Sequence, residues 1–363
     1  MCTSKTITAV LGGLYLIAAP ASAHHPSTGG GTGGSGPINV ISAATLTQGQ
    51  GAAALMFELI KLDPLGDHTL EHLAGDHVHA HSLDRILSPS LVLAYGVTSD
   101  FTVSFRLPFV ARTDIHEGHH HHHGGGAVNE VELRGDTSGI GDLTLLGQYR
   151  VLDNRTSGTE AAILLGVKTP TGRTGELDDG VLFEAEFQPG SGSWDGLFGL
   201  ALSQRLGPVS LGPVSLHASG LYTVVTEGTQ DTDLGDRLNY GVAVSYRLGG
   251  GSYAAGPMYA GAHGNHSHER GTPPHIHHEA APTPVLTVDL ILELNGEWSA
   301  KQKAAGVTDD NSGGHTLYLS PGVRITHGKV SGFASFGVPV VNELNGFQAE
   351  PDWRLFTGTA LAF

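Results

Sequence analysis

Residues 100–111 read DFTVSFRLPFVA and alternate between large apolar side chains and small, polar or charged ones. Because successive side chains of a β-strand point to opposite faces, this stretch predicts a strand with one wholly apolar face. The same alternation returns along the chain until the last residue, Phe363, and an apparent export signal stands in front of it. Together these features indicate a β-barrel whose apolar face meets lipid instead of a protein core.

Residues 1–23 have the composition of a removable export signal. Lys5 supplies a positive charge, residues 7–19 form a short apolar core, and residues 21–23 (ASA) match a small-residue cleavage site. The apolar run is shorter than the ~20 residues that a membrane-spanning helix needs. The single cysteine, Cys2, is expected to leave with this signal, so the mature chain should contain no disulfide.

The composition of the remaining chain also favours a barrel. Gly is abundant (53 of 363 residues), charged residues make up 15%, and no later run is long and apolar enough for a transmembrane helix. Low charge and short alternating runs are typical of outer-membrane barrels. A net charge of −16 without a basic cluster argues against nucleic acid as a partner. Residues 24–48, rich in Gly, Ser and Thr, are expected to form a flexible periplasmic lead-in to a barrel spanning 49–363.

Twelve strands are expected, an even number as in single-chain bacterial barrels. Their connections alternate between short and long, which predicts an all-β, transmembrane, antiparallel up-and-down barrel with short periplasmic turns, long outer loops and both termini in the periplasm. One connection breaks this rule, the Gly-, His- and Pro-rich periplasmic insert at 248–283. The expected strands are 51–61, 87–97, 100–111, 140–151, 160–169, 195–205, 214–224, 237–247, 285–297, 315–325, 330–340 and 353–363.

Alternation alone also fits a secreted β-sandwich. Two features count against that alternative. The outward faces are apolar on all twelve expected strands while the inward faces hold Gly, Ser, Thr and charges, which is the inverse of a soluble barrel. The chain also ends on Phe363, in the same parity as Trp353, Leu355 and Leu361, and an aromatic last residue resembles the signal read by the barrel-assembly machinery. Outer-membrane lipids and that machinery are therefore the expected partners, with localisation in the cell outer membrane.

Several motifs resemble one known family. They are SGIGDLTLLGQYRV (138–151), KTPTG (168–172), LILELNGEW (290–298) and LYLSPGVRI (317–325). These stretches are similar to the family of outer-membrane transporters named for the meta-pathway of phenol degradation. The resemblance covers most of the barrel and implies an outer-membrane barrel that acts as a channel.

The parity of the strands places charges of both signs inside the barrel. Buried charges must pair or stay hydrated, so they form either a paired network that plugs the lumen or a polar permeation path. In the second case Arg106 and Glu293 are the expected constriction charges. Four arginines near the periplasmic ends of their strands, at positions 150, 205, 247 and 324, form a basic exit ring or cap the rim. The inward charges are Glu58, Arg106, Asp142, Arg150, Lys168, Arg205, Arg247, Asp289, Glu293, Glu297, Arg324 and Arg354.

Most of the 22 histidines lie outside the expected strands, in outer loops at 63–84 and 112–136 and in the insert at 248–283. Neutral imidazole binds Zn, Ni, Co and Cu, and dense His tracts chelate such ions without a fixed cage. A solvated low-complexity loop and a pH sensor are the alternatives, and no obligatory cofactor is expected. The expected metal ligands are His68, His72, His77, His79, His81, His116, His119, His120, His121, His122, His123, His263, His266, His268, His275, His277 and His278.

Two stretches match zinc-protease motifs in form. HEGHH (116–120) matches H-E-x-x-H, and HTLEH (68–72) matches the inverted H-x-x-E-H pattern. Both mechanisms need a helix that carries the two histidines on one face. HEGHH runs into a His tract followed by glycines, and HTLEH has room only for a short loop helix, so no enzymatic activity is expected.

The preferred function is that of an outer-membrane channel or transporter for a small solute, with His-rich loops that bind transition-metal ions. Under this hypothesis the lumen carboxylates Asp289, Glu293 and Glu297 offer transient sites to the ion. Two alternatives stay open. One is a channel for small hydrophobic or aromatic compounds with incidental His tracts, and the other is a plugged barrel that acts as a metal buffer or adhesin.

Overall fold

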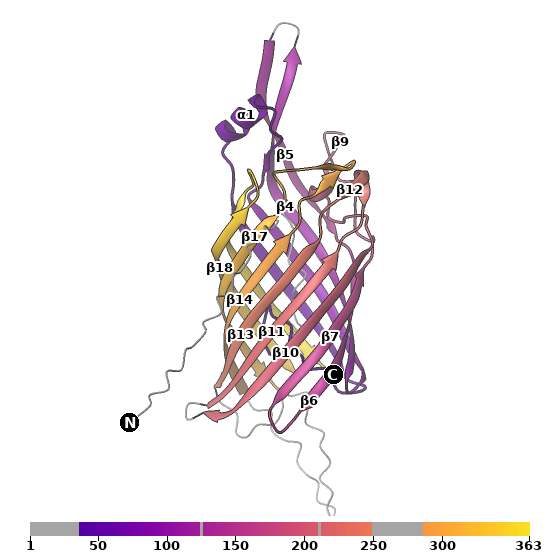
Figure 1. Cartoon of the computed structure of the whole chain (residues 1–363), viewed down its shortest axis with the longest axis vertical. Helices are drawn as coiled ribbons and strands as arrows, with labels where there is room; N and C mark the ends of the chain where they lie inside the picture. The colour runs from indigo at the N-terminus through magenta and orange to yellow at the C-terminus, as the bar shows by residue number, and fades with distance from the viewer. Residues whose placement is uncertain (1–35, 124–125, 210–211, 249–285) are drawn as a thin grey trace, which may run out of the picture.

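Twelve strands close on themselves in an antiparallel barrel in the computed structural model, which describes residues 36–123, 126–209, 212–248 and 286–363 (Figure 1). Each strand pairs with its neighbours in the chain, and the ring closes where β1 meets β19, with Leu55 opposite Thr359. In order around the barrel the strands are β1 (Gly51–Asp63), β3 (Arg85–Thr98), β4 (Phe101–His123), β6 (Thr144–Asn154), β7 (Thr159–Lys168), β10 (Asp195–Val209), β11 (Gly212–Val224), β13 (Arg237–Leu248), β14 (Leu286–Ser299), β17 (Gly314–His327), β18 (Val330–Leu344) and β19 (Glu350–Ala362).

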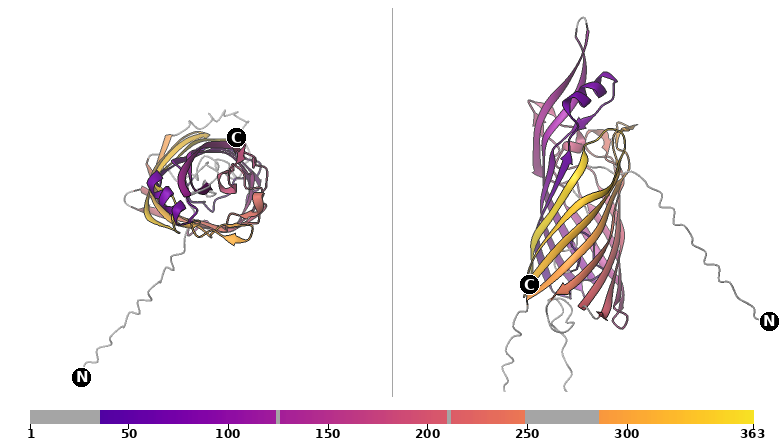
Figure 2. Two further views of the ribbon diagram at one scale, coloured as in Figure 1. Left: turned by 90° about the horizontal axis from the view of Figure 1, so that it is seen from above. Right: turned by 90° about the vertical axis from the view of Figure 1, so that its left-hand side faces the viewer.

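All twelve expected strands are confirmed, with ends that differ by a few residues except on β4, which continues beyond the expected end at 111 to His123. Viewed along the axis, the barrel is a closed ring (Figure 2). We call the end with the short connections 99–100, 155–158 and 328–329 the turn end, and the opposite end, with the long connections, the loop end. The C-terminus lies at the turn end (Figure 1).

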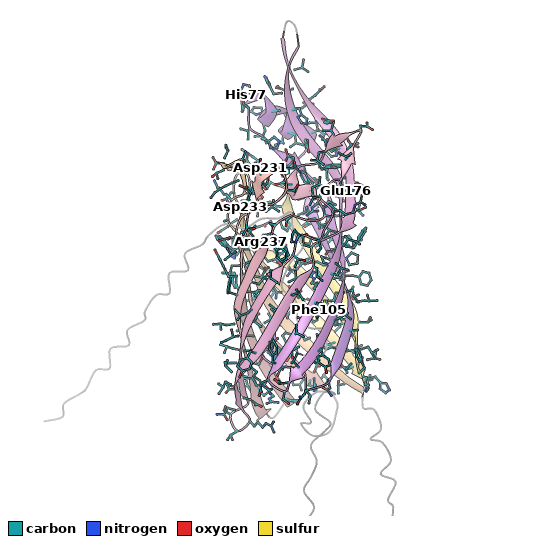
Figure 3. All side chains as sticks on the ribbon, turned by 90° about the vertical axis from the view of Figure 1, so that its right-hand side faces the viewer. His77, Phe105, Glu176, Asp231, Asp233 and Arg237 are labelled. Atoms are coloured by element: carbon teal, nitrogen blue, oxygen red, sulfur yellow. The ribbon has the colours of Figure 1, made fainter. Side chains whose placement is uncertain are left out.

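The predicted apolar exterior is confirmed. Phe105 of β4 and Leu200 of β10 point outward and are 41% and 63% exposed, and Phe105 lies on the barrel wall in Figure 3. Inward neighbours such as Thr102 and Ser203 are buried. An exterior of this kind is stable only against a hydrocarbon solvent, as in outer-membrane barrels. Among the described residues, no helix is long and apolar enough to cross a membrane.

The remaining helices and strands lie at the loop end. They are α1 (Asp67–Gly75), β2 (His81–Ser82), β5 (Gly126–Ile140), β8 (Leu177–Asp178), β9 (Val181–Leu182), η1 (Ala185–Phe187), η2 (Thr229–Asp231), β12 (Thr232–Asp233), β15 (Lys303–Ala304) and β16 (Val307–Thr308). The charged side chains of Glu176, Asp231 and Asp233 lie at this end in Figure 3.

The prediction that residues 112–136 form an irregular outer loop is wrong. β4 continues through His123 and β5 returns from Gly126, so the two form a long hairpin above the rim (Figure 1). The hairpin is supported by α1, which packs the apolar side chains of Leu70 and Leu73 against it. A Cβ at Gly118 would lie 2.7 Å from the Leu70 carbonyl oxygen, so this close approach requires glycine.

The described part of the expected flexible lead-in is also corrected. Residues 36–48 are ordered and lie inside the barrel, where Ile38, Val40 and Ala43 are buried. Residues 24–35, the expected export signal at 1–23 and the insert beyond Leu248 lie outside the described residues.

Candidate functional site

The segment 36–48, here called the N-terminal segment, is fastened to the barrel wall by one carboxylate. Glu293 of β14 is 1% exposed and accepts backbone N–H groups from three consecutive residues, Ile38, Asn39 and Val40, at 2.9 to 3.2 Å. The Asn39 side-chain amide also donates to Glu293, at 2.6 Å. A charged acceptor makes hydrogen bonds roughly twice as strong as neutral ones, so Glu293 is the principal anchor of the segment.

Further along, polar side chains of four other strands bond the backbone of the N-terminal segment between residues 41 and 46. These groups replace the sheet partners that the segment does not have, which keeps its buried backbone paired. Each contact is between 2.8 and 3.0 Å long. The wall residues are Thr102 (β4), Gln148 (β6), Ser203 (β10) and Ser219 (β11).

The apolar side chains of the N-terminal segment cover apolar patches on the inner wall. Ile38 packs in a cluster with Ile291 and Phe356. Ile41 and Ala43 pack in a second cluster, whose wall members are Ala162, Leu164, Leu197, Ala201 and Leu221. A cavity of about 20 Å³, room for about one water molecule, remains beside Asn39 and Val40. The wall is therefore complementary to this segment in both polar and apolar positions.

Many of the inward charges on the wall are paired with one another. Arg354 contacts both Glu297 and Glu58, and its guanidinium lies 4.1 Å from the ring centre of Tyr318. Arg247 binds Asp289 at 2.6 Å. This arrangement matches the paired-network alternative, in which buried charges neutralise each other.

Three acidic partners, Asp100, Glu160 and Asp195, are absent from the predicted set, although each stands at the first position of an expected strand and shares its inward parity. Lys168 lies 2.7 Å from Asp195 and 3.1 Å from Asp142. Arg150 pairs with Asp100 at 2.8 Å and with Glu160 at 3.3 Å.

The two expected constriction charges have different partners. Arg106 is half-buried and donates from Nε to the Ser90 hydroxyl at 3.2 Å, whereas Glu293 holds the N-terminal segment. Of the four expected exit-ring arginines, Arg324 donates to the Pro37 carbonyl at 3.1 Å and stacks over Phe333. The other three are ion-paired to carboxylates, so the ring is neutralised.

A second segment enters the lumen from the loop end. It comprises residues 177–188 of the connection between β7 and β10, here called the cap, and its Phe183 and Phe187 side chains are buried. They pack against inward apolar residues of β1, β3 and β4, namely Ile60, Leu62, Ile86, Val110 and Ile115. The buried Arg112 guanidinium donates to the carbonyls of Phe187 and Gln188 at 3.3 and 3.2 Å. The cap is therefore held by apolar packing and by hydrogen bonds from β4 and β5, among them one from the Thr137 hydroxyl to the Phe187 carbonyl at 2.8 Å.

Two of the expected metal ligands converge beside the cap. His79 and His81 lie with Glu184, and one donor atom of each is within 4.8 Å of the others. His79 Nε2 is 3.2 Å from Glu184, and His81 Nε2 is 2.5 Å from Glu186. Burial lowers the pKa of His81, but the neighbouring carboxylates of Glu186 and Glu184 outweigh it and raise the pKa to about 9.

The remaining described histidines of the expected set have separate partners. His116 lies between Asp67 and Asp114, and His119 lies between Glu117 and Glu132. His72 pairs with Asp76, and His120 bonds Asn129 and meets the ring of His77. His68 is exposed on α1, nothing is described for the side chains of 121–123, and His263 to His278 lie outside the described residues.

Neither protease-like motif forms a catalytic arrangement among the described residues. HEGHH (116–120) lies on the extended strand β4, where neighbouring side chains point to opposite faces. HTLEH (68–72) falls on α1, a helix of nine residues.

Comparison with known proteins places this geometry in a family. A family model described as "Putative MetA-pathway of phenol degradation" matches residues 93–273. Among solved structures, an outer membrane channel from Pseudomonas putida F1 is 15% identical with a TM-score of 0.50, and the match covers 88% of this chain and 98% of that one.

Two further structures are more distant. The beta domain of the Bordetella autotransporter BrkA is 12% identical with a TM-score of 0.45, over 87% of this chain and 100% of that one. A Pseudomonas aeruginosa FadL homologue is 8% identical with a TM-score of 0.37, over 95% and 98%. No curated protein matches the sequence. At these identities the likeness concerns the fold, which is that of outer-membrane proteins. The chain belongs to the family described as the MetA-pathway of phenol degradation.

Proposed function

We propose that this protein is an outer-membrane channel for a small solute and that the N-terminal segment occludes its lumen at rest. The observation that carries the proposal is the buried Glu293 carboxylate, which accepts three successive backbone N–H groups of that segment. A barrel of twelve strands is wider than the eight-stranded barrels that side chains just fill, and the N-terminal segment occupies part of the additional space.

The attachment of the N-terminal segment favours a reversible plug. The segment forms no strand and is absent from the sheet, so its removal breaks no strand pairing. Its bonds run to single side chains, and water can replace each of them in turn at a net cost of about 0.5–1.5 kcal/mol for neutral pairs.

The direct test is the conductance of the purified barrel in planar lipid bilayers. Deletion of residues 36–48 is expected to raise the single-channel conductance by several-fold. The matched control deletes residues 24–35 and keeps every residue that takes part in the described contacts of the N-terminal segment. Equal conductance of all three proteins would contradict the proposal and favour the alternative of a permanently plugged barrel.

The orientation belongs to the same proposal. Short turns face the periplasm in bacterial barrels and long loops face outward, which puts the loop end outside and the C-terminus in the periplasm. In that orientation the histidines of α1 and of the β4–β5 hairpin face the medium. We propose that these histidines capture transition-metal ions. We also propose that residues 1–23 direct export of the chain.

A second candidate solute is a small aromatic compound. The cap supports it, because Phe183 and Phe187 lie in an apolar cluster directly above the lumen. The family description, which names phenol degradation, points to the same class. Liposomes containing the barrel without residues 36–48 should take up benzoate faster than a sugar of similar size. Equal rates of uptake would reject a preference for aromatic solutes.

A further inference from the structure

The loop end contains a cluster of metal-binding side chains that joins two connections distant in sequence. His79 and His81 belong to the connection between β1 and β3, and Glu184 immediately precedes η1 of the cap. Their donor atoms lie within 4.8 Å of one another. Among the described residues this is the one group of three His, Cys, Asp or Glu side chains that meets this spacing.

One member of the cluster, His81, is held in place, unlike the histidines of the exposed tracts. His81 is 4% exposed, its backbone pairs with β4 opposite Glu117, and its ring meets the edge of Phe187 at 4.8 Å between centres. Glu186 contacts the same ring at 2.5 Å. Carboxylates that fix the orientation of a histidine ring are a regular feature of metal sites.

The donor types select the class of ion. Two imidazoles and one carboxylate are ligands of borderline softness, and such a set binds Zn²⁺, Co²⁺, Ni²⁺ or Cu²⁺ better than Mg²⁺ or Ca²⁺. Tetrahedral bonds of about 2.0–2.2 Å place donors roughly 3.4 Å apart, so the side chains must close by about 1 Å on binding. His79 and Glu184 are already 3.2 Å apart and only half-buried, which leaves them free to rotate into this geometry.

We propose that His79, His81 and Glu184 form a binding site for a divalent transition-metal ion that fastens the cap to the first outer loop. Two carboxylates, Glu184 and Glu186, supply local negative charge that favours a cation. A bound ion would resist any movement of the cap away from the wall. Such a site does not depend on whether the lumen conducts.

The test is calorimetric titration of the whole purified barrel with CoCl₂ and with ZnCl₂. Glu184→Gln should weaken the tightest site by at least 10-fold and abolish the visible absorption of tetrahedral Co²⁺. The matched control is Glu176→Gln, which changes the same residue type in the same connection and should keep the site.

A second measurement separates a specific site from the His tracts. Because a ligand that binds only the folded state raises its stability, ZnCl₂ should raise the unfolding temperature of the wild type more than that of Glu184→Gln. His79→Ala should behave like Glu184→Gln. If Glu184→Gln retains the wild-type affinity, Co²⁺ spectrum and Zn²⁺ stabilisation, the site does not exist and the ion is held by the other histidines.

Discussion

The N-terminal segment and the cap both occupy the inside of the barrel, yet they are attached by different forces. The N-terminal segment is held by hydrogen bonds from its backbone to Glu293, Ser203 and other wall side chains, and its Ile38 and Ile41 side chains are buried in two separate apolar clusters. The cap buries Phe183 and Phe187 in the wall's largest inward apolar cluster. Removal of the cap exposes the larger continuous apolar surface, whereas more of the attachment of the N-terminal segment consists of separate hydrogen bonds that water can replace one by one.

This difference assigns the two segments different roles. A plug that opens needs an attachment whose cost of release is a few kcal/mol, whereas a cap that stabilises the rim needs continuous packing. We therefore expect changes at the cap to lower the stability of the whole barrel. Changes at the N-terminal segment should alter gating and leave stability nearly unchanged.

The largest expected effect is on the cap. Phe187→Ala removes a buried aromatic side chain and should lower the free energy of unfolding by about 3–5 kcal/mol. The measurement is equilibrium unfolding in guanidinium, followed by the heat-modifiable migration of the folded barrel. Leu177→Ala, at a side chain that is 59% exposed, is the control and should have an effect near zero. A loss below about 1 kcal/mol for Phe187→Ala would show that the cap is not part of the core.

The second-largest effect is expected for a change at Glu293, the anchor of the N-terminal segment. Glu293→Ala removes the acceptor of three backbone N–H groups, and bonds to charged groups are each worth about 1.5–3 kcal/mol. Docking should weaken by at least about 2 kcal/mol, which is roughly a 30-fold rise in the ratio of open to closed time. Single-channel dwell times measure this ratio.

Glu293→Gln sharpens the same comparison. It keeps a carbonyl acceptor at the same place but removes the charge, so the open-to-closed ratio should fall between those of wild type and Glu293→Ala. If all three proteins gate alike, Glu293 is not the anchor.

The smallest effect is expected at a single neutral contact. Ser203→Ala removes the hydroxyl that accepts the Ala43 N–H at 3.0 Å. The loss should be about 1 kcal/mol, or roughly a 5-fold change in the open-to-closed ratio, with no change in unfolding. A change as large as that of Glu293→Ala would contradict an attachment built from independent bonds.

The strands were predictable because lipid imposes a strict period. Every outward position must be apolar, so Phe105, Leu107 and Phe109 on one strand suffice to fix its faces and its approximate ends. Outside the lipid that constraint ends. The sequence of the β4–β5 hairpin is rich in His and Gly, and its extended form is accompanied by pairing between the two strands and by packing of α1 against them.

The N-terminal segment was missed for a different reason. Its Gly-rich surroundings suggested a flexible tail, although residues 38–46 (INVISAATL) carry apolar side chains at intervals. The sequence of β14 contains a sign of this contact, because Ile291 points inward between Asp289 and Glu293. An apolar residue in a polar lumen indicates something that covers it. Glu184 could not be found from sequence, because it meets His79 and His81 only through the fold of the cap.

The proposed channel depends most on the N-terminal segment acting as its gate. Ser42 Oγ lies 3.2 Å from Ser203 Oγ, so the pair Ser42→Cys and Ser203→Cys can be joined by a disulfide across the lumen. With Cys2 replaced by Ser, the oxidised double variant should stay closed in planar bilayers, and after reduction it should open at least as often as the wild type. Ser203→Cys alone should not respond to oxidation. Oxidised channels that open as often as reduced ones would contradict the account.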